Sequence, residues 1–312
     1  MVGSVKKIIA VILCLTVIFL ALSGSSSVAE KKLLKPGSRI NPGISNTEAP
    51  GITTVSNKKV EIDISNISKG YFAINYKGLS DCIKVFVSKG DVQNVYDISN
   101  EKPGEYVFVP LHDGDGAYSV AIWEHIFEDL YKRIFRKTLD VALAFEASPF
   151  LYPSAYVDYS EQNSAVSIAA SLALSADCDL DVVKAVYDYL VKEIKYSKKL
   201  EKEVLAGKKY VTDIDEILAN KAGICVDYAT LMAAMLRSQG IPAMVVAGSV
   251  ERDGKVLYPS HAWVRVYLRD ADEPGWIVVD PTHGATTRWQ FGQVDESGLK
   301  APNVDYIEEY RY

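Results

Sequence analysis

The chain has 312 residues, 48% of them hydrophobic, and carries 34 basic against 40 acidic side chains, a formal charge of −6. A net negative charge disfavours binding to nucleic acid or to an anionic lipid surface, because both attract basic proteins. The length is sufficient for two domains with separate hydrophobic cores.

The first 29 residues have the pattern of a secretory signal peptide. Lys6 and Lys7 precede an apolar run from Ile8 to Leu22, and small residues follow as far as Ala29. A membrane-spanning helix needs about 20 apolar residues, so this run is short for a permanent anchor, which is the alternative interpretation. We therefore expect cleavage after Ala29 and a secreted, extracellular or cell-surface protein. Its 32 basic and 40 acidic residues would give a formal charge of −8.

Residues 30–57 are rich in Lys, Pro, Gly, Ser, Asn and Thr without an apolar period, which predicts a flexible linker. Residues 58–147 instead contain short segments in which apolar and polar side chains alternate, separated by Gly-containing turns. These segments lie at 60–65, 72–76, 83–87, 92–98, 105–111, 117–124 and 131–145. About seven short strands at this spacing predict an immunoglobulin-like β-sandwich.

Pro149 and Pro153 mark the start of a second domain, residues 148–290, in which the hydrophobic spacing becomes helical. Asp179 is a plausible N-cap for an amphipathic helix that continues to Ile194. A charged segment at 198–209 and a short helix from Asp213 follow. Residues 291–312 are polar and aromatic and are predicted to form a C-terminal tail.

Cys225 lies at the predicted start of a helix that ends before Gly240, and Pro242 follows. Gly just beyond a helix and Pro shortly after it are typical helix stop signals. In the first turn, unpaired backbone N–H groups and the positive end of the helix dipole both favour a thiolate. Cys225 is therefore a candidate nucleophile.

His261 and Asp280 are the candidate partners of this thiol. His261 opens a segment of period two that predicts a strand, and Asp280 closes a second strand immediately before Pro281. His261 is eight positions before the connecting loop and Asp280 only five positions after it. Pairing within the loop, or a β-bulge, would therefore be needed to place the two residues opposite each other on the neighbouring strands. A nucleophile, an imidazole and a carboxylate are the groups that thiolate acyl transfer requires.

Four ordered segments carry a family resemblance. They are Gly-Ile-Cys-Val-Asp-Tyr-Ala at 223–229, Leu-Arg-Ser-Gln-Gly-Ile-Pro-Ala at 236–243, His-Ala-Trp-Val at 261–264 and Trp-Ile-Val-Val-Asp-Pro-Thr at 276–282. About residues 180–285 resemble the transglutaminase-like superfamily of papain-type cysteine enzymes. The resemblance implies an α+β domain in which the helix that carries the cysteine packs on an antiparallel sheet. It also implies that Cys225 is the nucleophile, His261 the general base and Asp280 its orienting acid.

Other roles for these residues were weighed. Asp280 could simply end a strand before Pro281. A zinc site formed by Cys225, His261, Asp280 and His283 lacks the close ligand pairs that zinc sites usually have. The backbone N–H of Cys225 is one expected oxyanion donor, and a side chain between Tyr187 and Tyr196 could be the second.

Three cysteines follow the signal peptide, and an odd number predicts one free thiol, for which Cys225 is the natural candidate. Cys82 and Cys178 are expected to stay reduced, with a disulfide between them as the alternative. Trp263 and Trp276 are expected to pack around the site.

The sequence thus predicts a secreted enzyme that performs acyl transfer or hydrolysis on amide bonds of proteins or peptides through a thioester at Cys225. No metal or organic cofactor is needed for that chemistry. The expected partners are a protein or peptide substrate, an amine acceptor and the cell surface or cell wall, but not nucleic acid. The alternatives are a cysteine protease that cleaves extracellular or cell-wall peptides, and a catalytically silent surface-binding or scaffold module.

Overall fold

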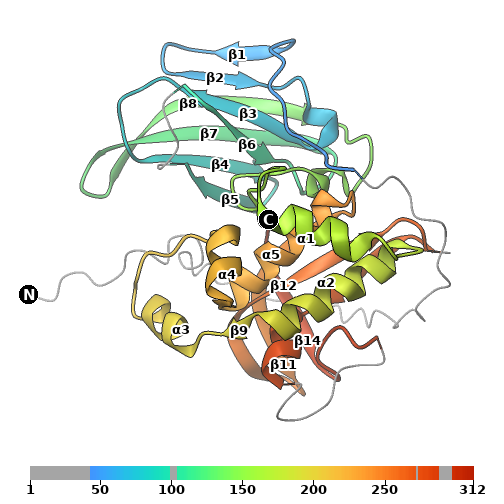
Figure 1. The fold of residues 1–312 in the computed structure, drawn as a ribbon. Coiled ribbons are helices and arrows are strands. Elements are labelled where there is room, and N and C mark those ends of the chain that lie inside the picture. The colour runs from blue at the N-terminus through green and yellow to red at the C-terminus, as the bar shows by residue number, and fades with distance from the viewer. Residues whose placement is uncertain (1–42, 99–103, 272, 288–296) are drawn as a thin grey trace, which may run out of the picture.

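The structure is a computed structural model that describes residues 43–98, 104–271, 273–287 and 297–312. It has a mixed α/β fold with antiparallel sheets. The strands that come first in the chain lie in one half of the molecule, and the helices lie in the other half with a later sheet (Figure 1).

The first half contains two four-stranded antiparallel sheets, with the strand orders β1-β2-β3-β6 and β5-β4-β7-β8. A short 3-10 helix, η1 (Ile67–Lys69), precedes β3. The strands are β1 (Thr54–Ser56), β2 (Val60–Asp63), β3 (Tyr71–Tyr76), β4 (Ile83–Lys89), β5 (Val92–Asp97), β6 (Tyr106–Pro110), β7 (Gly116–Phe127) and β8 (Leu130–Val141).

Alternating apolar side chains explain these strands. In β4, for example, Ile83, Val85 and Val87 are buried, whereas the residues between them are partly exposed. Each of the seven predicted strand segments overlaps one of the strands β2 to β8. The immunoglobulin-like arrangement of the two sheets stays a prediction.

Strand β1 is a difference from the sequence-based expectation, because it lies within residues 30–57, the predicted linker. Its residues pair with β2 in an antiparallel ladder. The chain before it is also held in place, since the Gly51 backbone N–H donates to the Asp63 carboxylate at 2.6 Å. A three-residue edge strand formed mainly through backbone hydrogen bonds has no hydrophobic period that could reveal it.

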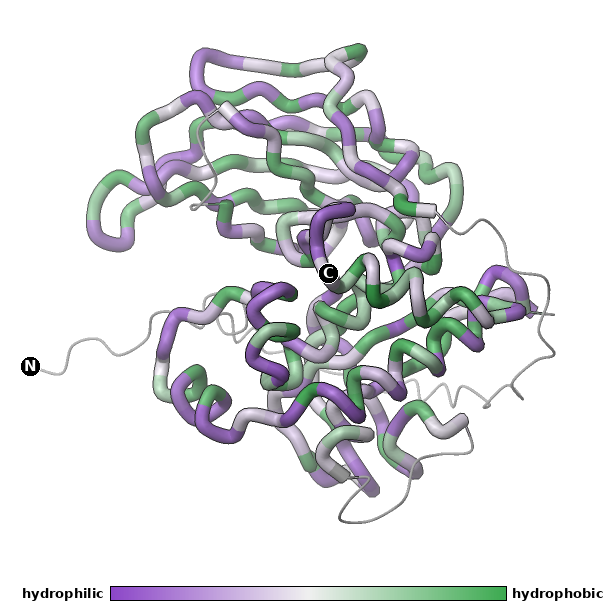
Figure 2. Tube along the Cα trace, in the orientation of Figure 1, coloured by the Kyte–Doolittle hydropathy of each residue, from purple (hydrophilic) through white to green (hydrophobic). Residues whose placement is uncertain are grey.

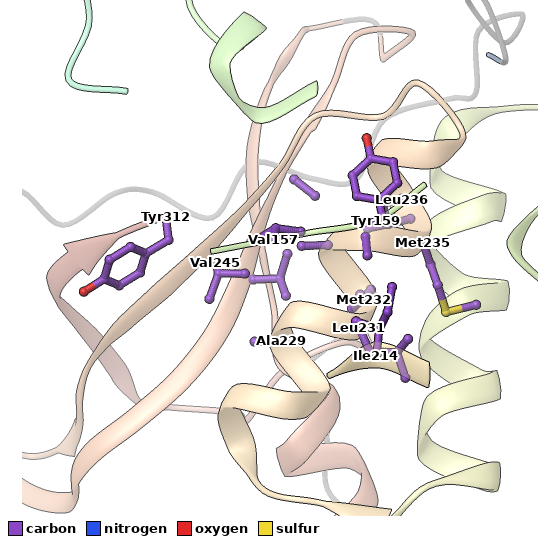
Figure 3. Packing of buried hydrophobic residues seen from close by; sticks show 14 of the residues in the cluster. Val157, Tyr159, Ile214, Ala229, Leu231, Met232, Met235, Leu236, Val245 and Tyr312 are labelled. Carbon is purple, nitrogen blue, oxygen red and sulfur yellow. The ribbon is translucent and has the colours of Figure 1, made fainter. Parts of the chain in front are cut away.

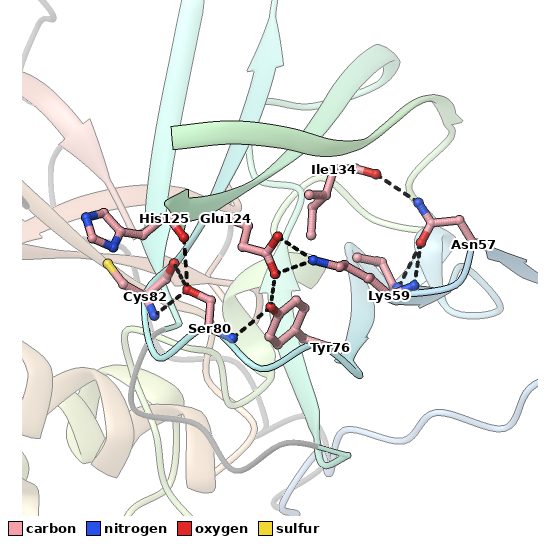
Figure 4. A network of polar contacts seen from close by, with 9 residues as sticks. Asn57, Lys59, Tyr76, Ser80, Cys82, Glu124, His125 and Ile134 are labelled. Carbon is pink, nitrogen blue, oxygen red and sulfur yellow. Dashed lines mark hydrogen bonds and ion pairs between the residues drawn. The ribbon is translucent and has the colours of Figure 1, made fainter. Parts of the chain in front are cut away.

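A polar network joins the residue before β2 to β3 and β7 (Figure 4). Glu124 accepts hydrogen bonds from the Lys59 ammonium, at 2.8 and 2.6 Å, and from the Tyr76 hydroxyl. The Tyr76 hydroxyl in turn accepts from the Ser80 backbone N–H at 3.1 Å. Because Glu124 is buried, these donors satisfy a carboxylate that would otherwise be costly to remove from water.

The second half contains the helices and the remaining strands. A 3-10 turn, η2 (Ser148–Leu151), leads into it. The helices are α1 (Ser164–Ala173), α2 (Asp179–Glu193), α3 (Lys198–Leu205), α4 (Ile214–Asn220), α5 (Cys225–Ser238) and α6 (Pro281–Thr287). The strands are β9 (Lys195–Tyr196), β10 (Ala222–Gly223), β11 (Ala243–Arg252), β12 (Lys255–Leu268), β13 (Gly275–Val279) and β14 (Asp305–Arg311).

Helix α5 is the centre of this half. It packs against β11 and β12 of an antiparallel sheet with the order β13-β12-β11-β14, and α1 and α2 cover it. Its side chains are buried almost from end to end, and Figure 3 shows Leu231, Met232 and Met235 among residues from neighbouring elements. A helix that is apolar on all sides is expected where it is enclosed by other elements.

Two element boundaries differ from the expectations. The N-cap of α2 is Cys178 rather than Asp179, which is the first helical residue; the Asp179 backbone N–H donates to the Asp270 carboxylate. The predicted tail contains β14, which pairs with β11 over Val246–Glu251 and completes the sheet. The alternating exposure of Asp305–Arg311 explains this strand.

A buried guanidinium fixes the end of α5. Arg237 donates to the backbone carbonyls of Ala243 at 2.8 Å, Tyr152 at 2.9 Å and Tyr312 at 3.1 Å. Burial lowers the pKa of Arg237 to about 10, so it stays protonated at neutral pH. One side chain therefore links the end of the helix, the chain leading into this half and the residue that follows β14.

Hydropathy differs strongly between the surface helix α3 and the enclosed helices (Figure 2). Helix α3 corresponds to the first part of the charged segment predicted at 198–209, and none of its residues is buried. In the described part of the chain, no helix combines the length and the apolar composition that crossing a membrane requires. The predicted signal peptide lies outside the described residues.

Candidate active site

Cys225 is the first residue of α5, after the N-cap Ile224. The approach to the helix is fixed by a short parallel pair in which Gly223 of β10 lies opposite Tyr196 of β9. The Ser197 backbone N–H donates to the Gly223 carbonyl at 2.8 Å. The thiol is thus held at a helix N-terminus, where the partial positive charge of the dipole favours an anion.

Asp227 caps the same helix from inside. Its carboxylate accepts from the Ile224 backbone N–H at 2.8 Å and from the Tyr210 hydroxyl at 3.0 Å. Burial raises the pKa of Asp227, and these hydrogen bonds act in the opposite direction. The structural role expected for an acid in the first turn agrees with this geometry.

His261 and Asp280 meet across strands β12 and β13. The ladder runs from Leu268 opposite Gly275 to Val264 opposite Val279 without a bulge. Asp280 follows at the next position, so it lies diagonally from His261 on the same face of the sheet. Diagonal neighbours on one face are within reach of longer side chains. The predicted bulge or loop pairing is therefore unnecessary. The two residues are not directly opposite each other, but their side chains are long enough to form the hydrogen bond.

The Asp280 carboxylate is buried and fully engaged. Its Oδ2 accepts from His261 Nε2 at 2.8 Å and from the Tyr306 hydroxyl at 3.0 Å, and its Oδ1 accepts from the His283 backbone N–H at 2.9 Å. Because Nε2 of His261 faces Asp280, Nδ1 is the ring nitrogen available for the hydrogen bond between His261 and Cys225.

The electrostatics of the pair favour charge separation. Burial alone would lower the pKa of His261, but the Asp280 carboxylate and the hydrogen bond with Cys225 outweigh it and raise the pKa to about 10. Burial would likewise raise the pKa of Asp280, but the His261 charge and the hydrogen bonds hold it below its usual value. The imidazole is therefore protonated and the carboxylate ionised at neutral pH.

Aromatic rings enclose this imidazole. The centroid of the Tyr258 ring lies 5.4 Å from that of the His261 ring, and the Trp263 ring stacks on the imidazole with 6.2 Å between centroids. Trp263 is fully buried and forms a small apolar cluster with Phe150, Met244 and Val246, against which Trp276 packs. Trp263 thus packs against the site, as expected from the sequence, whereas Trp276 packs on the cluster behind it.

Tyr306 lies in the predicted tail, where nothing in the sequence marks it as a site residue. Strand β14 nevertheless brings its hydroxyl to Asp280 and its ring to 5.0 Å from Trp263. Alternation of polar and aromatic or aliphatic side chains from Asp305 to Arg311 is the signal that could have revealed the strand. No sequence pattern gives the direction of the hydroxyl.

The remaining candidates are distributed as follows. Tyr196 lies beside the Cys225 loop, and its hydroxyl donates to Glu201 at 2.8 Å. Cys82 and Cys178 are both free thiols, so the alternative disulfide is absent. Within the described ranges, no group of three or more His, Cys, Asp or Glu side chains is arranged to hold a metal ion.

The sequence of this region is similar to that of known proteins. Residues 166–281, which contain Cys225, His261 and Asp280, match the model of the transglutaminase-like superfamily. These residues form a transglutaminase-like domain. Strand β14, with Tyr306, lies beyond the matched segment.

The transglutaminase-like domain has relatives among curated proteins. An uncharacterized protein, YebA of Bacillus subtilis, is 32% identical over 142 residues, which cover 41% of this chain and 19% of YebA. A protein-glutamine gamma-glutamyltransferase of Pseudomonas aeruginosa is 39% identical over 77 residues, 22% of this chain and 11% of that protein. The chain therefore matches about a fifth or less of the length of these relatives.

Among solved structures, the periplasmic domain of TgpA from Pseudomonas aeruginosa is similar over 82% of this chain and 83% of that one. The sequence identity is 18% and the TM-score is 0.35.

Proposed function

We propose that the protein is a thiol-dependent enzyme that transfers or hydrolyses acyl groups of protein or peptide amides, with Cys225 as nucleophile. The observation that carries the proposal is the hydrogen-bonded pair of His261 and Asp280 next to the Cys225 thiol, which lies at the N-terminus of α5. The match of residues 166–281 to the transglutaminase-like superfamily supports the same class of chemistry.

The first half-reaction forms a thioester. The Cys225 thiolate attacks the carbonyl carbon of a carboxamide or peptide bond, and the C–N bond breaks as the tetrahedral intermediate collapses. The His261 imidazolium donates its proton to the leaving nitrogen, so ammonia or an amine departs as a neutral molecule. The backbone N–H groups of the first turn of α5 are suited to stabilise the oxyanion.

The second half-reaction resolves the thioester. The neutral His261 imidazole accepts a proton from water or from an incoming amine, which then attacks the thioester carbon and releases the thiolate. Asp280 fixes the imidazole so that Nε2 carries its proton toward the carboxylate, and it stabilises the imidazolium in both half-reactions. Water gives an acid product, whereas an amine gives a new amide.

The test uses the protein with a library of glutamine-containing peptides and an isotopically labelled primary amine, followed by mass spectrometry of peptides and protein. An acyl adduct on Cys225 and a glutamyl-amide product support transamidation, and a plain acid supports deamidation. Cys225→Ala should abolish both the adduct and the product. Cys82→Ala is the matched control, because Cys82 is another partly exposed free thiol, and it should react like the wild type.

The same experiment decides between the alternatives. Backbone fragments instead of a modified glutamine would make the protein a cysteine protease. If no peptide acylates Cys225 and Cys225→Ala still binds the cell surface or cell wall, the proposed enzyme function is wrong and the scaffold alternative holds.

Two further features belong to the proposal. The signal-like pattern of residues 1–29 favours a protein that works outside the cytoplasm, secreted or at the cell surface, where peptide substrates and amine acceptors are found. An immunoglobulin-like sandwich made of strands β2 to β8 would support the enzyme domain or bind a partner. Fractionation of cells that express the full chain tests the location.

A further inference from the structure

The Tyr306 hydroxyl is oriented by contacts on both sides. It accepts a hydrogen bond from the Ala301 backbone N–H at 3.3 Å and donates to Asp280 Oδ2 at 3.0 Å. Because one lone pair of the oxygen is directed at Ala301, the hydroxyl proton is directed at the carboxylate. The same Oδ2 accepts from His261 Nε2, so the phenol and the imidazole share one acceptor atom.

The local backbone holds this arrangement in place. The Asp280 backbone N–H donates to the Leu299 carbonyl at 2.9 Å, so residues 299–301 lie against the end of β13 and present Ala301 to the phenol. The Tyr306 ring packs edge-on against Trp263, with 5.0 Å between the centroids. Both the ring and the hydroxyl are therefore fixed by neighbours.

Strand β14 can approach β11 closely because Gly248 of β11 has no side chain. A Cβ atom at Gly248 would lie 1.9 Å from the Ile307 carbonyl oxygen and 3.0 Å from the Trp263 ring. Register shifts lie next to Gly248 on both sides, toward β12 and toward β14. Bulges of this kind bend strands and redirect side chains. The sheet is thus shaped so that a residue of its far edge strand reaches the acid at the other edge.

We propose that Tyr306 is a positioning residue, whose hydroxyl fixes the Asp280 carboxylate in the orientation that aligns His261 with Cys225. The proposal rests on the proposed function, since it assigns Tyr306 to the reaction of Cys225. Tyr306 acts only through Asp280 and does not touch the reacting atoms. It lies outside residues 166–281, so the match to the superfamily does not include it.

The first test is Tyr306→Phe, which removes one oxygen atom and keeps the ring contact with Trp263. Loss of a hydrogen bond to a charged acceptor should slow turnover roughly 10-fold. A carboxylate with one donor fewer is less stable when ionised, so the pKa of Asp280 should rise and the acid limb of the rate of Cys225 alkylation should move to higher pH. Tyr310→Phe, on the same strand and also partly buried, is the matched control and should leave the pH profile of Cys225 alkylation unchanged.

Incorporation of 3-fluorotyrosine at position 306 provides an opposite change. The fluorinated phenol is a stronger hydrogen-bond donor, so the acid limb should move to lower pH while the ring packing is preserved. Shifts in opposite directions for the two variants would not arise from a loss of folding stability. If the rate of Cys225 alkylation depends on pH in the same way in the wild type, Tyr306→Phe and the fluorinated protein, the proposal is overturned.

A double-mutant cycle tests the route of action. If Tyr306 works through Asp280, adding Tyr306→Phe to Asp280→Asn should cause no further loss of alkylation rate or turnover. A full additional loss in the double variant would overturn the positioning role, because it would mean that Tyr306 acts independently.

A spectroscopic measurement separates this proposal from the proposed function. In protein labelled with ¹⁵N-histidine, the His261 Nε2–H resonance should shift in Tyr306→Phe and stay in place in Tyr310→Phe, with no substrate needed. If this shift occurs but no substrate acylates Cys225, the proposed function fails while the link from Tyr306 to Asp280 holds. If substrates are turned over and Tyr306→Phe changes neither the turnover rate nor the His261 Nε2–H resonance, the positioning role of Tyr306 is wrong and the proposed function stands.

Discussion

Gly223 and Asp227 are so close that a side chain on the glycine has no room: a Cβ atom there would lie 2.7 Å from the Asp227 Cβ. Asp227 in turn holds the Ile224 backbone N–H immediately before Cys225. The position of Cys225, the proposed nucleophile, therefore depends on the absence of a side chain two residues before it.

Gly223→Ala should consequently destabilise the protein and displace the start of α5. Overpacking of a tight contact costs roughly 1–3 kcal/mol, which a urea titration can measure, and alkylation of Cys225 should slow in the same variant. Gly275→Ala is the control, because no atom lies within 4 Å of the position its Cβ would take. An equal effect of both substitutions on stability would contradict this prediction.

Cys225 should be the thiol that reacts fastest with iodoacetamide below neutral pH. Cys225 lies at a helix N-terminus beside the protonated His261, whereas Cys82 contacts the Tyr131 hydroxyl and Cys178 is buried. Peptide mapping after short exposures at several pH values gives the three rates. Uniform rates at Cys225 and Cys82 would remove the nucleophile assignment.

Asp280→Asn should fold and still bind substrate, but turnover should fall. In a serine-based triad the same replacement costs about 10⁴-fold, and the loss here should be smaller because a thiolate needs less help from a base. The pKa of His261 should also fall, since the opposing carboxylate charge is gone. Asp305→Asn, at the exposed start of β14, is the control. Unchanged turnover in Asp280→Asn would exclude Asp280 from the mechanism.

The stabilising effect of His261 should depend on pH. The pKa of His261 is raised from 6.5 to about 10 in the folded protein. Its contribution to the free energy of unfolding is therefore fully present below about pH 6.5 and is lost as the pH rises toward 10. The difference in unfolding free energy between wild type and His261→Gln, measured by urea titration across this window, should shrink as the pH increases. A difference that grows with pH would mean that the imidazole is neutral in the folded state.

Arg237→Lys should lower the stability of the whole helical half. The lysine retains the charge but cannot reach all three carbonyls that the guanidinium binds, and the loss should be about 2–3 kcal/mol. Arg252→Lys is a matched control, because Arg252 also donates to backbone carbonyls but is exposed. Arg252→Lys should lower the midpoint of thermal unfolding much less than Arg237→Lys. Comparable losses of stability in the two variants would show that the contribution of Arg237 to stability does not depend on its burial.

Local patterns predicted much of this structure because the side chains that define them are buried. The alternation in β4 and the enclosed apolar helix that begins at Cys225 left clear periods in the sequence. The residues Cys225, His261 and Asp280 were predicted together because the segments that carry them resemble the transglutaminase-like superfamily, and the structure places His261 against Asp280.

What the sequence did not reveal depends on contacts between distant segments. Strand β1 forms through backbone pairing and has almost no apolar period. The offset between His261 and Asp280 is closed by side-chain length, which a count of strand positions cannot include. The approach of Tyr306 to Asp280 depends on Gly248 and on bends in the sheet, neither of which has a signature at position 306.

The return of the chain into the sheet through β14 has a practical consequence for any shortened version of the transglutaminase-like domain. A fragment that ends at Thr287 would contain the whole match to the superfamily, yet β11 would become an unpaired edge and Arg237 would lose the Tyr312 carbonyl. Such a fragment would expose strand edges that promote aggregation. A fragment of this domain made for expression should therefore include β14 and Tyr312.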